Sequence, residues 1–386
     1  MNTKELDNEY VAHSYGRFDV ALEKGKGSTL YDENGKEYID FGSGIGVTAF
    51  GIADDEWKKA VIEQLDNLQH VSNLYYTSPC ARLAKLLCDK TGMKKVFFSN
   101  SGAESNEGAI KFARKYSHDK YGDGRSTIIT LVNSFHGRTI TTLAATGQDV
   151  FHTDFGPFTD GFKYCPANDI EALNEMATDD VCAVMFECIQ GEGGVNNLDY
   201  DFVKAIEKLA KEKDILMVVD EVQTGNGRTG KYFAYENFDI KPDIVSTAKG
   251  LAGGLPMGAV LFGDKVCDTV TPSSHGSTFG GNPICAAGAI SIVERIDDDF
   301  LAEVAAKGEY IKDYLSNIDG VDNISGMGLM IGFTAGNAGE IANKCLEKGL
   351  LVLTAHQNKV RLLPALSISY AELDKGLKIL KEVIEK

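Results

Sequence analysis

The feature that most constrains the fold of this chain is a series of short apolar runs between residues 96 and 262. The runs are nearly continuous in apolar or β-branched residues, which is typical of strands covered on both faces. Helical patterns at 104–116 and 202–212 separate them, and this alternation predicts a mostly parallel α/β sheet with helices on both faces. The predicted strands are Val96–Phe98, Thr127–Val132, Cys182–Phe186, Ile215–Val219, Ile244–Thr247 and Ala259–Phe262.

A second, smaller α/β region is predicted after the glycine-rich stretch Gly276–Pro283. A helical pattern begins near Ile284, short strands follow at 328–333, 352–354 and 360–363, and a last helix covers Tyr370–Glu385. The first 45 residues contain a hairpin-like segment, Ser28–Phe41, that turns at Glu33–Gly35. We expect three parts: an N-terminal segment (1–48) packing with the small domain, a large domain (49–283) and a small C-terminal domain (284–386).

Composition excludes several classes of function. The net charge of -17 over 386 residues disfavours nucleic acid and anionic membranes as partners. No apolar run approaches the roughly 20 residues that span a bilayer, and residues 1–16 lack a secretory pattern. The eight cysteines form no C-x-x-C pair, so we expect reduced thiols, a cytoplasmic location and no metal site.

Polar residues follow the predicted strands at their carboxyl ends, where open α/β sheets bind ligands. Lys249 follows one strand, and it must pair its charge or lose it, for example in a Schiff base with an aldehyde cofactor. Asp220 ends an unusually apolar strand, where a carboxylate can keep a pyridine nitrogen protonated. Alone, the lysine fits a side chain reaching solvent and the aspartate fits a turn cap. Together they favour a ring cofactor bound between them.

Two further stretches carry weaker signals. Ser101 and Glu104 fit a capping box, and the same helix start, with Gly102, exposes backbone N–H groups that can bind a phosphate. Phe135 can stack on a flat ring, and Arg138 can grip a carboxylate. A core phenylalanine and a surface arginine explain the last two residues equally well.

One motif indicates a different class of protein. Residues Gly225–Gly230 read G-x-G-x-x-G, as in dinucleotide-binding folds. That fold needs the motif directly after a strand and at the start of a helix, and here Glu221–Thr224 intervene. We interpret the match as a loop, so a nucleotide-dependent oxidoreductase is the remote alternative. A non-catalytic protein on the same fold is a third, disfavoured by the presence of both Lys249 and Asp220.

Taken together, these motifs resemble the class III aminotransferases of pyridoxal-phosphate (PLP) fold type I, over nearly the whole chain. The resemblance implies a large, seven-stranded, mostly parallel sheet domain and a small α/β domain. The motifs that carry it are Phe98–Glu104 (FSNSGAE), Ser134–Thr139 (SFHGRT), Gln190–Gly193 (QGEG), Asp220–Gly225 (DEVQTG) and Ala248–Gly250 (AKG).

The resemblance also implies roles for individual residues. Lys249 and Asp220 are the catalytic pair, and Lys249 also moves the proton. The cofactor is bound by Gly102, Ala103, Phe135, Asp220, Glu221, Val222, Gln223, Lys249 and Thr278, with Thr278 reaching the cofactor of the other subunit of a homodimer. Glu187 belongs to the hydrogen-bond network around the ring. Arg138, Ser277, Glu192 and Arg361 contact substrate, and Glu192 and Arg361 form a switch pair: Glu192 neutralises Arg361 until 2-oxoglutarate binds.

Within the family, the resemblance is strongest to enzymes of arginine biosynthesis that convert N2-acetyl-L-ornithine and 2-oxoglutarate to N-acetyl-L-glutamate 5-semialdehyde and L-glutamate. The ornithine-specific enzymes of the family that this chain resembles carry a tyrosine at the position of Ile45. An apolar residue there suits an acylated amine. Succinylornithine, free ornithine and 4-aminobutyrate remain alternative donors. Cys188 and the segment Gly51–Glu56 depart from the family pattern outside the catalytic residues, and we expect an altered loop with activity retained.

Overall fold

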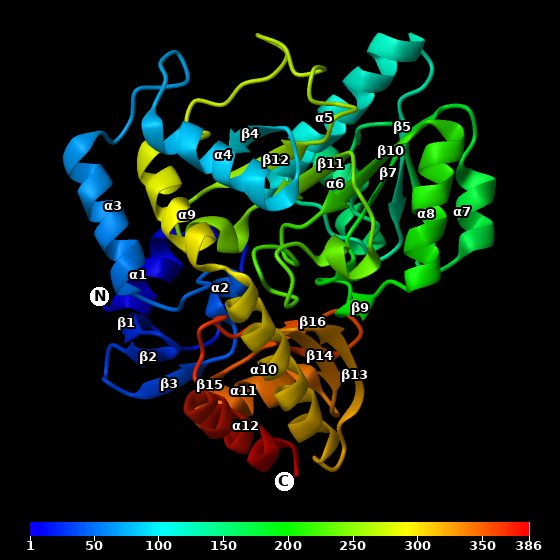
Figure 1. Ribbon diagram of the computed structural model, residues 1–386. Helices are drawn as coiled ribbons and strands as arrows, with labels where there is room; N and C mark the ends of the chain where they lie inside the picture. Colours follow the sequence, from blue (N-terminus) through cyan, green and yellow to red (C-terminus); the bar gives the residue numbers. More distant parts are fainter. Residues whose placement is uncertain (386) are drawn as a thin grey trace.

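The computed structural model describes residues 1–385, and its centre is a seven-stranded sheet in the order β4-β12-β11-β10-β7-β5-β6 (Figure 1). Only β12 runs against the other strands, since it pairs antiparallel with both β4 and β11. The strands are β4 (Lys95–Ser99), β5 (Thr127–Leu131), β6 (Phe162–Cys165), β7 (Val181–Phe186), β10 (Leu216–Asp220), β11 (Ile244–Thr247) and β12 (Gly258–Phe262). The mostly parallel sheet and its six predicted strands are confirmed. The seventh strand, β6, was not among the predicted runs.

Successive residues of these strands enter two different hydrophobic clusters, which explains why the runs are apolar without alternation. Met217 and Val219 belong to the larger cluster, and Leu216 and Val218 belong to a second one that includes Phe112. Helix α5 (Gly102–Tyr121) covers the second face. The face that contributes to the larger cluster packs against four other helices. These are α4 (Ser78–Thr91), α7 (Ile170–Met176), α8 (Tyr200–Lys213) and α9 (Pro283–Arg295).

The C-terminal elements form a separate layered unit, which lies below the large sheet in Figure 1. Its sheet has the order β13-β14-β17-β16 and is antiparallel throughout. The elements are α10 (Asp298–Ser316), β13 (Asp322–Met327), β14 (Met330–Thr334), α11 (Ala338–Glu347), β15 (Leu350–Leu351), β16 (Leu353–Ala355), β17 (Lys359–Leu362) and α12 (Tyr370–Ile384).

The N-terminal region contributes a third sheet that the C-terminal region completes. The predicted hairpin is present, with Thr29 opposite Ile39 and a left-handed Gly35 in the turn. Its second strand then pairs in parallel with β15, Ile39 opposite Leu350. The elements of this region are α1 (Thr3–Tyr10), β1 (Leu22–Lys26), β2 (Thr29–Asp32), β3 (Glu37–Asp40), the short α2 (Ser43–Gly46) and α3 (Asp55–Asn67). The domain boundaries at 48 and 283 stay a prediction.

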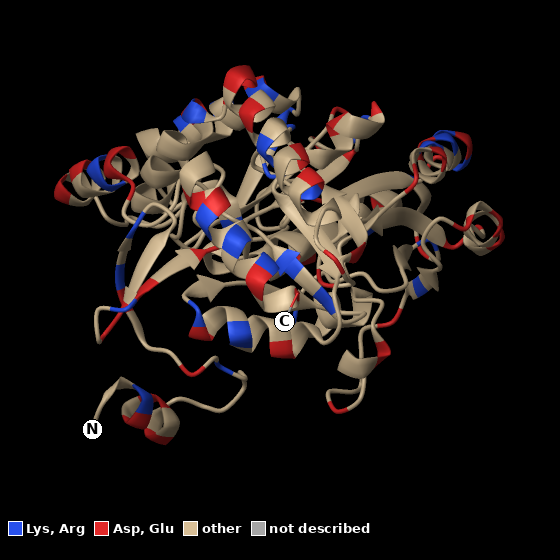
Figure 2. Ribbon diagram, turned by 90° about the horizontal axis from the view of Figure 1, so that it is seen from below, with Lys and Arg blue, Asp and Glu red and all other residues tan. Residues whose placement is uncertain are grey.

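The outer helices carry charges of both signs, interspersed along each helix in Figure 2. Many of these charges form exposed i,i+4 pairs, such as Lys85–Asp89 and Lys115–Asp119, which contribute little to stability. Within residues 1–385 no helix is long and apolar enough to cross a membrane, and no group of acidic, histidine and cysteine side chains is placed to hold a metal ion.

Candidate active site at the carboxyl edge of the large sheet

The carboxyl ends of β4, β5, β7, β10 and β11 meet at one edge of the large sheet, and most of the predicted site residues lie there. Asp220 is the last residue of β10, and Lys249 begins the 3-10 turn Lys249–Ala252 directly after β11. Asp220 stands opposite Ser246 in the parallel pairing of these strands. The sheet topology therefore brings the predicted carboxylate and the predicted lysine to neighbouring positions.

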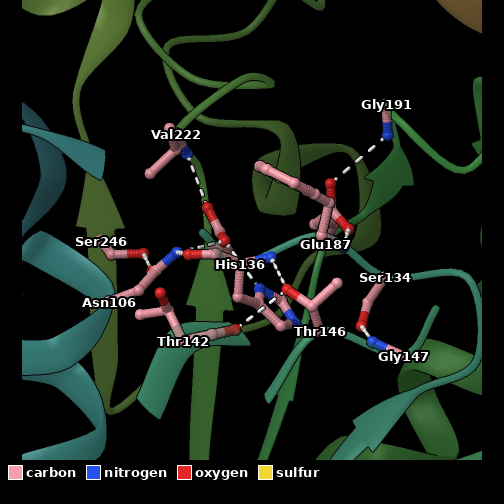
Figure 3. A network of polar contacts seen from close by, with 12 residues as sticks. Asn106, Ser134, His136, Thr142, Thr146, Gly147, Glu187, Gly191, Val222 and Ser246 are labelled. Atoms are coloured by element: carbon pink, nitrogen blue, oxygen red, sulfur yellow. Dashed lines mark hydrogen bonds and ion pairs between the residues drawn. The ribbon is translucent and has the colours of Figure 1, made fainter. Parts of the chain in front are cut away.

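Asp220 is almost fully buried, and three protein donors hold its carboxylate. The Val222 N–H donates to Oδ1 over 2.9 Å, while His136 Nδ1 and Asn106 Nδ2 lie 2.8 and 2.7 Å from Oδ2. Figure 3 shows Asn106, His136 and Val222 converging on this point. A carboxylate has about four acceptor positions, so one remains for a ligand. A protonated ring nitrogen is the type of donor that fits it.

Lys249 presents an amine without a partner. Among residues 1–385 its Nζ makes no hydrogen bond or ion pair, although carboxylates lie near it. Burial lowers the pKa of Lys249, while Glu192 and Asp220 act in the opposite direction. Its backbone is left-handed, with φ of 44°, a conformation that costs a residue with a side chain about 1–2 kcal/mol. A partly buried, more easily deprotonated amine suits reaction with an aldehyde.

The start of helix α5 forms the third corner of the site. Ser101 caps the helix by accepting from the Glu104 N–H over 3.2 Å, which leaves the first-turn N–H groups of Gly102 and Ala103 without helical partners. A Cβ added to Gly102 would lie 2.5 Å from a Val222 methyl carbon, so glycine is needed for this close approach. Only half of the predicted capping box is present, because Glu104 Oε2 accepts from the N–H of Asn100 rather than from that of Ser101. The exposed N–H groups suit a phosphate.

Glu187 lies at the end of β7 and joins the same network. Its carboxylate accepts from the Phe135 N–H over 3.0 Å and from the Gly191 N–H over 3.3 Å. Burial raises the pKa of Glu187 to about 7, against the lowering influence of nearby His136. The Phe135 ring is half-buried and meets the Phe151 ring edge-on. Arg138 is exposed, with its guanidinium 4.0 Å above the Phe151 ring, so it reaches solvent beside the site.

Glu192 and Arg361 are in direct contact, although they are far apart in the sequence and Glu192 lies in the turn after Gln190. Arg361, on β17, places Nη1 2.7 Å and Nη2 3.3 Å from the two Glu192 oxygens, and Gln223 bridges both side chains. Burial raises the pKa of Glu192, but Arg361 outweighs it, so the net pKa is lower than usual. The buried Arg361 Nε has no acceptor among the described residues. This arginine therefore has unused capacity to bind a carboxylate.

Glu221, Ser277 and Thr278 remain of the predicted site residues, and their surroundings differ. The Glu221 carboxylate accepts from the Thr224 hydroxyl and the Tyr235 N–H inside a turn, and it is fully buried there. Ser277 accepts from Asn100 Nδ2 near the start of α5, whereas Thr278 is exposed on the surface. The G-x-G-x-x-G match is a buried turn without a helix, as the loop interpretation predicted.

Sequence reasoning missed two residues that hold Asp220. Asn106 lies on the buried face of α5, one turn after Gly102, and His136 was noted only as a neighbour of Phe135. A signal for Asn106 was available, because Ser105 and Asn106 are polar residues of low helix propensity inside a helix. For His136, the signal was a histidine between the predicted stacking residue and Arg138.

A buried carboxylate with one open acceptor position, an unpaired lysine and an open helix start, all at one edge of a mostly parallel sheet, define a PLP-dependent enzyme of the aminotransferase fold. A family model described as aminotransferase class-III matches residues 10–384. The chain belongs to this family, and it is a PLP-dependent aminotransferase.

The chain is also similar to curated proteins and to solved structures. The chain is 52% identical to an acetylornithine aminotransferase of Haemophilus ducreyi over 99% of this chain and 98% of that protein. It is 43% identical to one from Methanocaldococcus jannaschii over 99% and 98%. A solved N-acetylornithine aminotransferase from Stenotrophomonas maltophilia is 35% identical, covers 98% of both chains and has a TM-score of 0.85. An ornithine aminotransferase from Toxoplasma gondii has a TM-score of 0.95 at 29% identity, covering 100% of this chain and 95% of that chain.

Proposed function

We propose that this enzyme transfers the terminal amino group of N2-acetyl-L-ornithine to 2-oxoglutarate, giving N-acetyl-L-glutamate 5-semialdehyde and L-glutamate, as a step of arginine biosynthesis. The observation that carries the proposal is the Glu192–Arg361 pair beside Lys249. Such a pair suits two successive substrates, one whose reacting carbon carries no carboxylate and one whose reacting carbon carries a carboxylate. The identity of 52% to a curated acetylornithine aminotransferase over nearly the full length supports the same substrate.

The contacts at the sheet edge support a proposed role for each of these residues. When bound, PLP supplies an aldehyde carbon that takes up the amino group and a protonated ring that accepts the released electron pair. Asp220 holds the ring nitrogen, and Phe135 packs against the ring face. Gly102 and Ala103 donate N–H groups to the phosphate, and the Val222 side chain closes the wall beside them. The Lys249 amine would bond the aldehyde carbon of PLP, and it would move the proton at the reacting carbon of the substrate.

Gln223 and Glu187 complete the polar surroundings. Gln223 would hold the ring hydroxyl, and its amide also contacts both members of the switch pair, Glu192 and Arg361. Glu187 fixes the backbone of Phe135 and of Gly191. Arg138, exposed beside Phe135 and Phe151, binds the carboxylate of the donor that is distant from the reacting carbon.

Ile45 supports an acylated donor over a charged one. Its main chain is left-handed, with φ of 65°, which is rare for a β-branched residue and clusters at functional sites. The next residue, Gly46, places its carbonyl against Gly250, beside Lys249. Ile45 itself lines an apolar cavity of about 330 Å³ with Val20, Leu351 and others. Apart from Asp40 and Thr48, the residues that line this cavity are apolar or glycine, which suits an acyl group.

A homodimer with shared sites and a cytoplasmic location belong to the same proposal. An aromatic surface that includes Tyr75, Tyr76 and Phe279 is exposed in the single chain, next to Ser277 and Thr278. A second copy covering this surface brings Thr278 to the phosphate of its partner's cofactor. All eight cysteines are free, as expected in a reducing compartment.

The first test compares amino donors in a single half-reaction. PLP-loaded protein is mixed with N2-acetylornithine or with free ornithine at equal concentration, and loss of the aldehyde form of the cofactor is followed by absorbance. We expect the acetylated donor to react faster by at least roughly tenfold, a difference of about 1.4 kcal/mol. Faster reaction with ornithine moves the enzyme to the branch of the solved Toxoplasma relative. Succinylornithine and 4-aminobutyrate are run in the same series.

Replacing Arg361 by alanine tests the switch pair. The glutamate half-reaction should weaken by roughly a hundredfold, because a bidentate charged hydrogen bond to the α-carboxylate is lost, while the acetylornithine half-reaction changes little. Pre-steady-state rates of the two halves provide the measurement. Glu192→Gln is the matched variant, since it removes the neutralising charge and leaves Arg361 in place. Equal losses of rate in both half-reactions of Arg361→Ala would contradict the proposed switch.

A further inference from the structure

We propose that Asn106 is a positioning residue that orients the Asp220 carboxylate and keeps it ionised for the ring nitrogen of the cofactor. The inference rests on the role of Asp220 proposed above. It concerns a side chain that lies 114 positions from Asp220 in the sequence and within 2.7 Å of it in the fold. Asn106 does not face the substrate and acts only through Asp220 and its neighbours.

The amide of Asn106 has one possible orientation. Its nitrogen lies 2.7 Å from Asp220 Oδ2 and 2.7 Å from the backbone oxygen of His136, and both of these atoms are acceptors. Its oxygen accepts from the Ser246 hydroxyl over 2.6 Å. Turning the amide over would place its oxygen against two acceptors, which is repulsive. Asn106 is therefore a fixed donor to Asp220, and Ser246 fixes it (Figure 3).

This donor acts where water is excluded. Asn106 is 1% exposed and Ser246 is fully buried, so hydrogen bonds between them and Asp220 are not replaced by solvent. A hydrogen bond to the ionised carboxylate favours that form over the protonated one. The other charged and titratable groups near Asp220 are His136 in the loop after β5, Glu187 directly after β7 and Lys249 after β11. Removing Asn106 leaves the Val222 N–H and His136 as the remaining donors to the carboxylate.

Helix α5 couples this donor to the phosphate end of the site. Gly102 and Asn106 are four residues apart, so they lie on the same face of the helix, one turn from each other. The helix therefore fixes the separation between the N–H groups that suit the phosphate and the amide that holds Asp220. Helix α5 therefore helps to position both the phosphate and the ring nitrogen of the cofactor.

The test measures PLP binding to the apoenzyme as a function of pH, so it needs no substrate turnover. We expect Asn106→Ala to weaken PLP binding by roughly tenfold near neutral pH, as for the loss of a hydrogen bond to a charged group. Asn106→Ala removes one hydrogen bond to the ionised carboxylate, so the pH midpoint below which PLP affinity falls should move upward. The protonation of free PLP is the same in every experiment. A difference in the pH midpoint between variants therefore reports on the protein.

Two further variants make the test decisive. Ser246→Ala removes the group that fixes the amide, and it should move the midpoint in the same direction by a smaller amount. Ser117→Ala is the control, because this buried α5 hydroxyl has no partner among the described residues, and its binding should match the wild type. Thermal unfolding of each apoenzyme checks folding, and Ser246→Ala decides the matter where Asn106→Ala does not fold.

The outcomes separate this inference from the proposed function. Weaker binding with an unmoved midpoint in both variants shows a structural role only and overturns the inference, as does unchanged binding. Asp220→Ala is measured in parallel: if it also leaves PLP affinity unchanged, the placement of the cofactor against Asp220 is what fails. A loss with Asp220→Ala and none with Asn106→Ala or Ser246→Ala overturns the positioning role alone.

Discussion

Replacing Lys249 by alanine should lower kcat/KM for transamination by at least roughly 10⁴-fold. A positioned acid–base group contributes about 10²- to 10⁴-fold, and the variant also loses the amine that bonds the cofactor. No other lysine has a role in the proposed site. Among residues 1–385 the Lys249 amine has no hydrogen-bond or ion-pair partner, so it is available to the cofactor. Steady-state assays with saturating PLP measure the loss, so that weaker cofactor binding does not imitate it.

A covalent label checks the reason for that loss. Borohydride makes the bond between lysine and PLP permanent, and peptide mapping by mass spectrometry should place the label on Lys249 in the wild type. Lys249→Arg keeps the positive charge and should be as inactive as the alanine variant, because a guanidinium does not form this bond. Lys241→Ala, at an exposed position before β11, should be labelled and active as the wild type. A label on another lysine in the wild type would contradict the assignment.

Asp220→Ala should reduce kcat of both half-reactions by roughly a thousandfold. The carboxylate stabilises the protonated ring, and a pair of opposite charges in contact at a protein site is worth about 4 kcal/mol. Both halves need the same electron sink, so the loss should be similar in each, unlike the one-sided loss expected for Arg361→Ala. Single-turnover rates with acetylornithine and with glutamate make the comparison.

The matched variants for Asp220 vary charge and shape separately. Asp220→Asn keeps the shape and removes the charge, and it should be nearly as slow as the alanine variant. Asp220→Glu keeps the charge on a longer side chain and should recover part of the rate. An asparagine variant close to wild-type rate would show that charge at this position is not what the reaction requires.

The strands of the large sheet could be predicted because they are buried on both faces, so that nearly every position is apolar. The one that sequence reasoning missed, β6, lies at the edge of the sheet and reads Phe-Lys-Tyr-Cys, with Lys163 reaching Asp180 at the surface. An edge strand carries such polar residues without cost, so its pattern resembles a loop. Helix α1 was also missed, although Asn2 and Glu5 form a capping box before it.

The site could be predicted in part for a related reason. Residues at the carboxyl ends of parallel strands must meet, so Asp220, Lys249, Phe135 and Gly102 could be grouped from the sequence alone. What the sequence does not contain is the direction of each side chain. Glu221 follows Asp220 directly, yet its carboxylate turns into the protein and bonds Tyr235. Asn106 reaches Asp220 only because α5 packs on β11 and β12, a contact that no local pattern indicates.

The antiparallel strand β12 has a consequence for how the protein is made. Edge strand β4 pairs only with β12, Ser99 opposite Gly258, and α5 follows β4 directly. During synthesis, β4 and α5 leave the ribosome long before their partner strand does, and such distant pairings form slowly. A nascent chain that ends before Gly258 already holds Asp220 and Lys249, but it lacks β12, which pairs with β4 and packs against α5. The reactive aldehyde of PLP therefore meets a complete binding site only on a chain whose large sheet is finished.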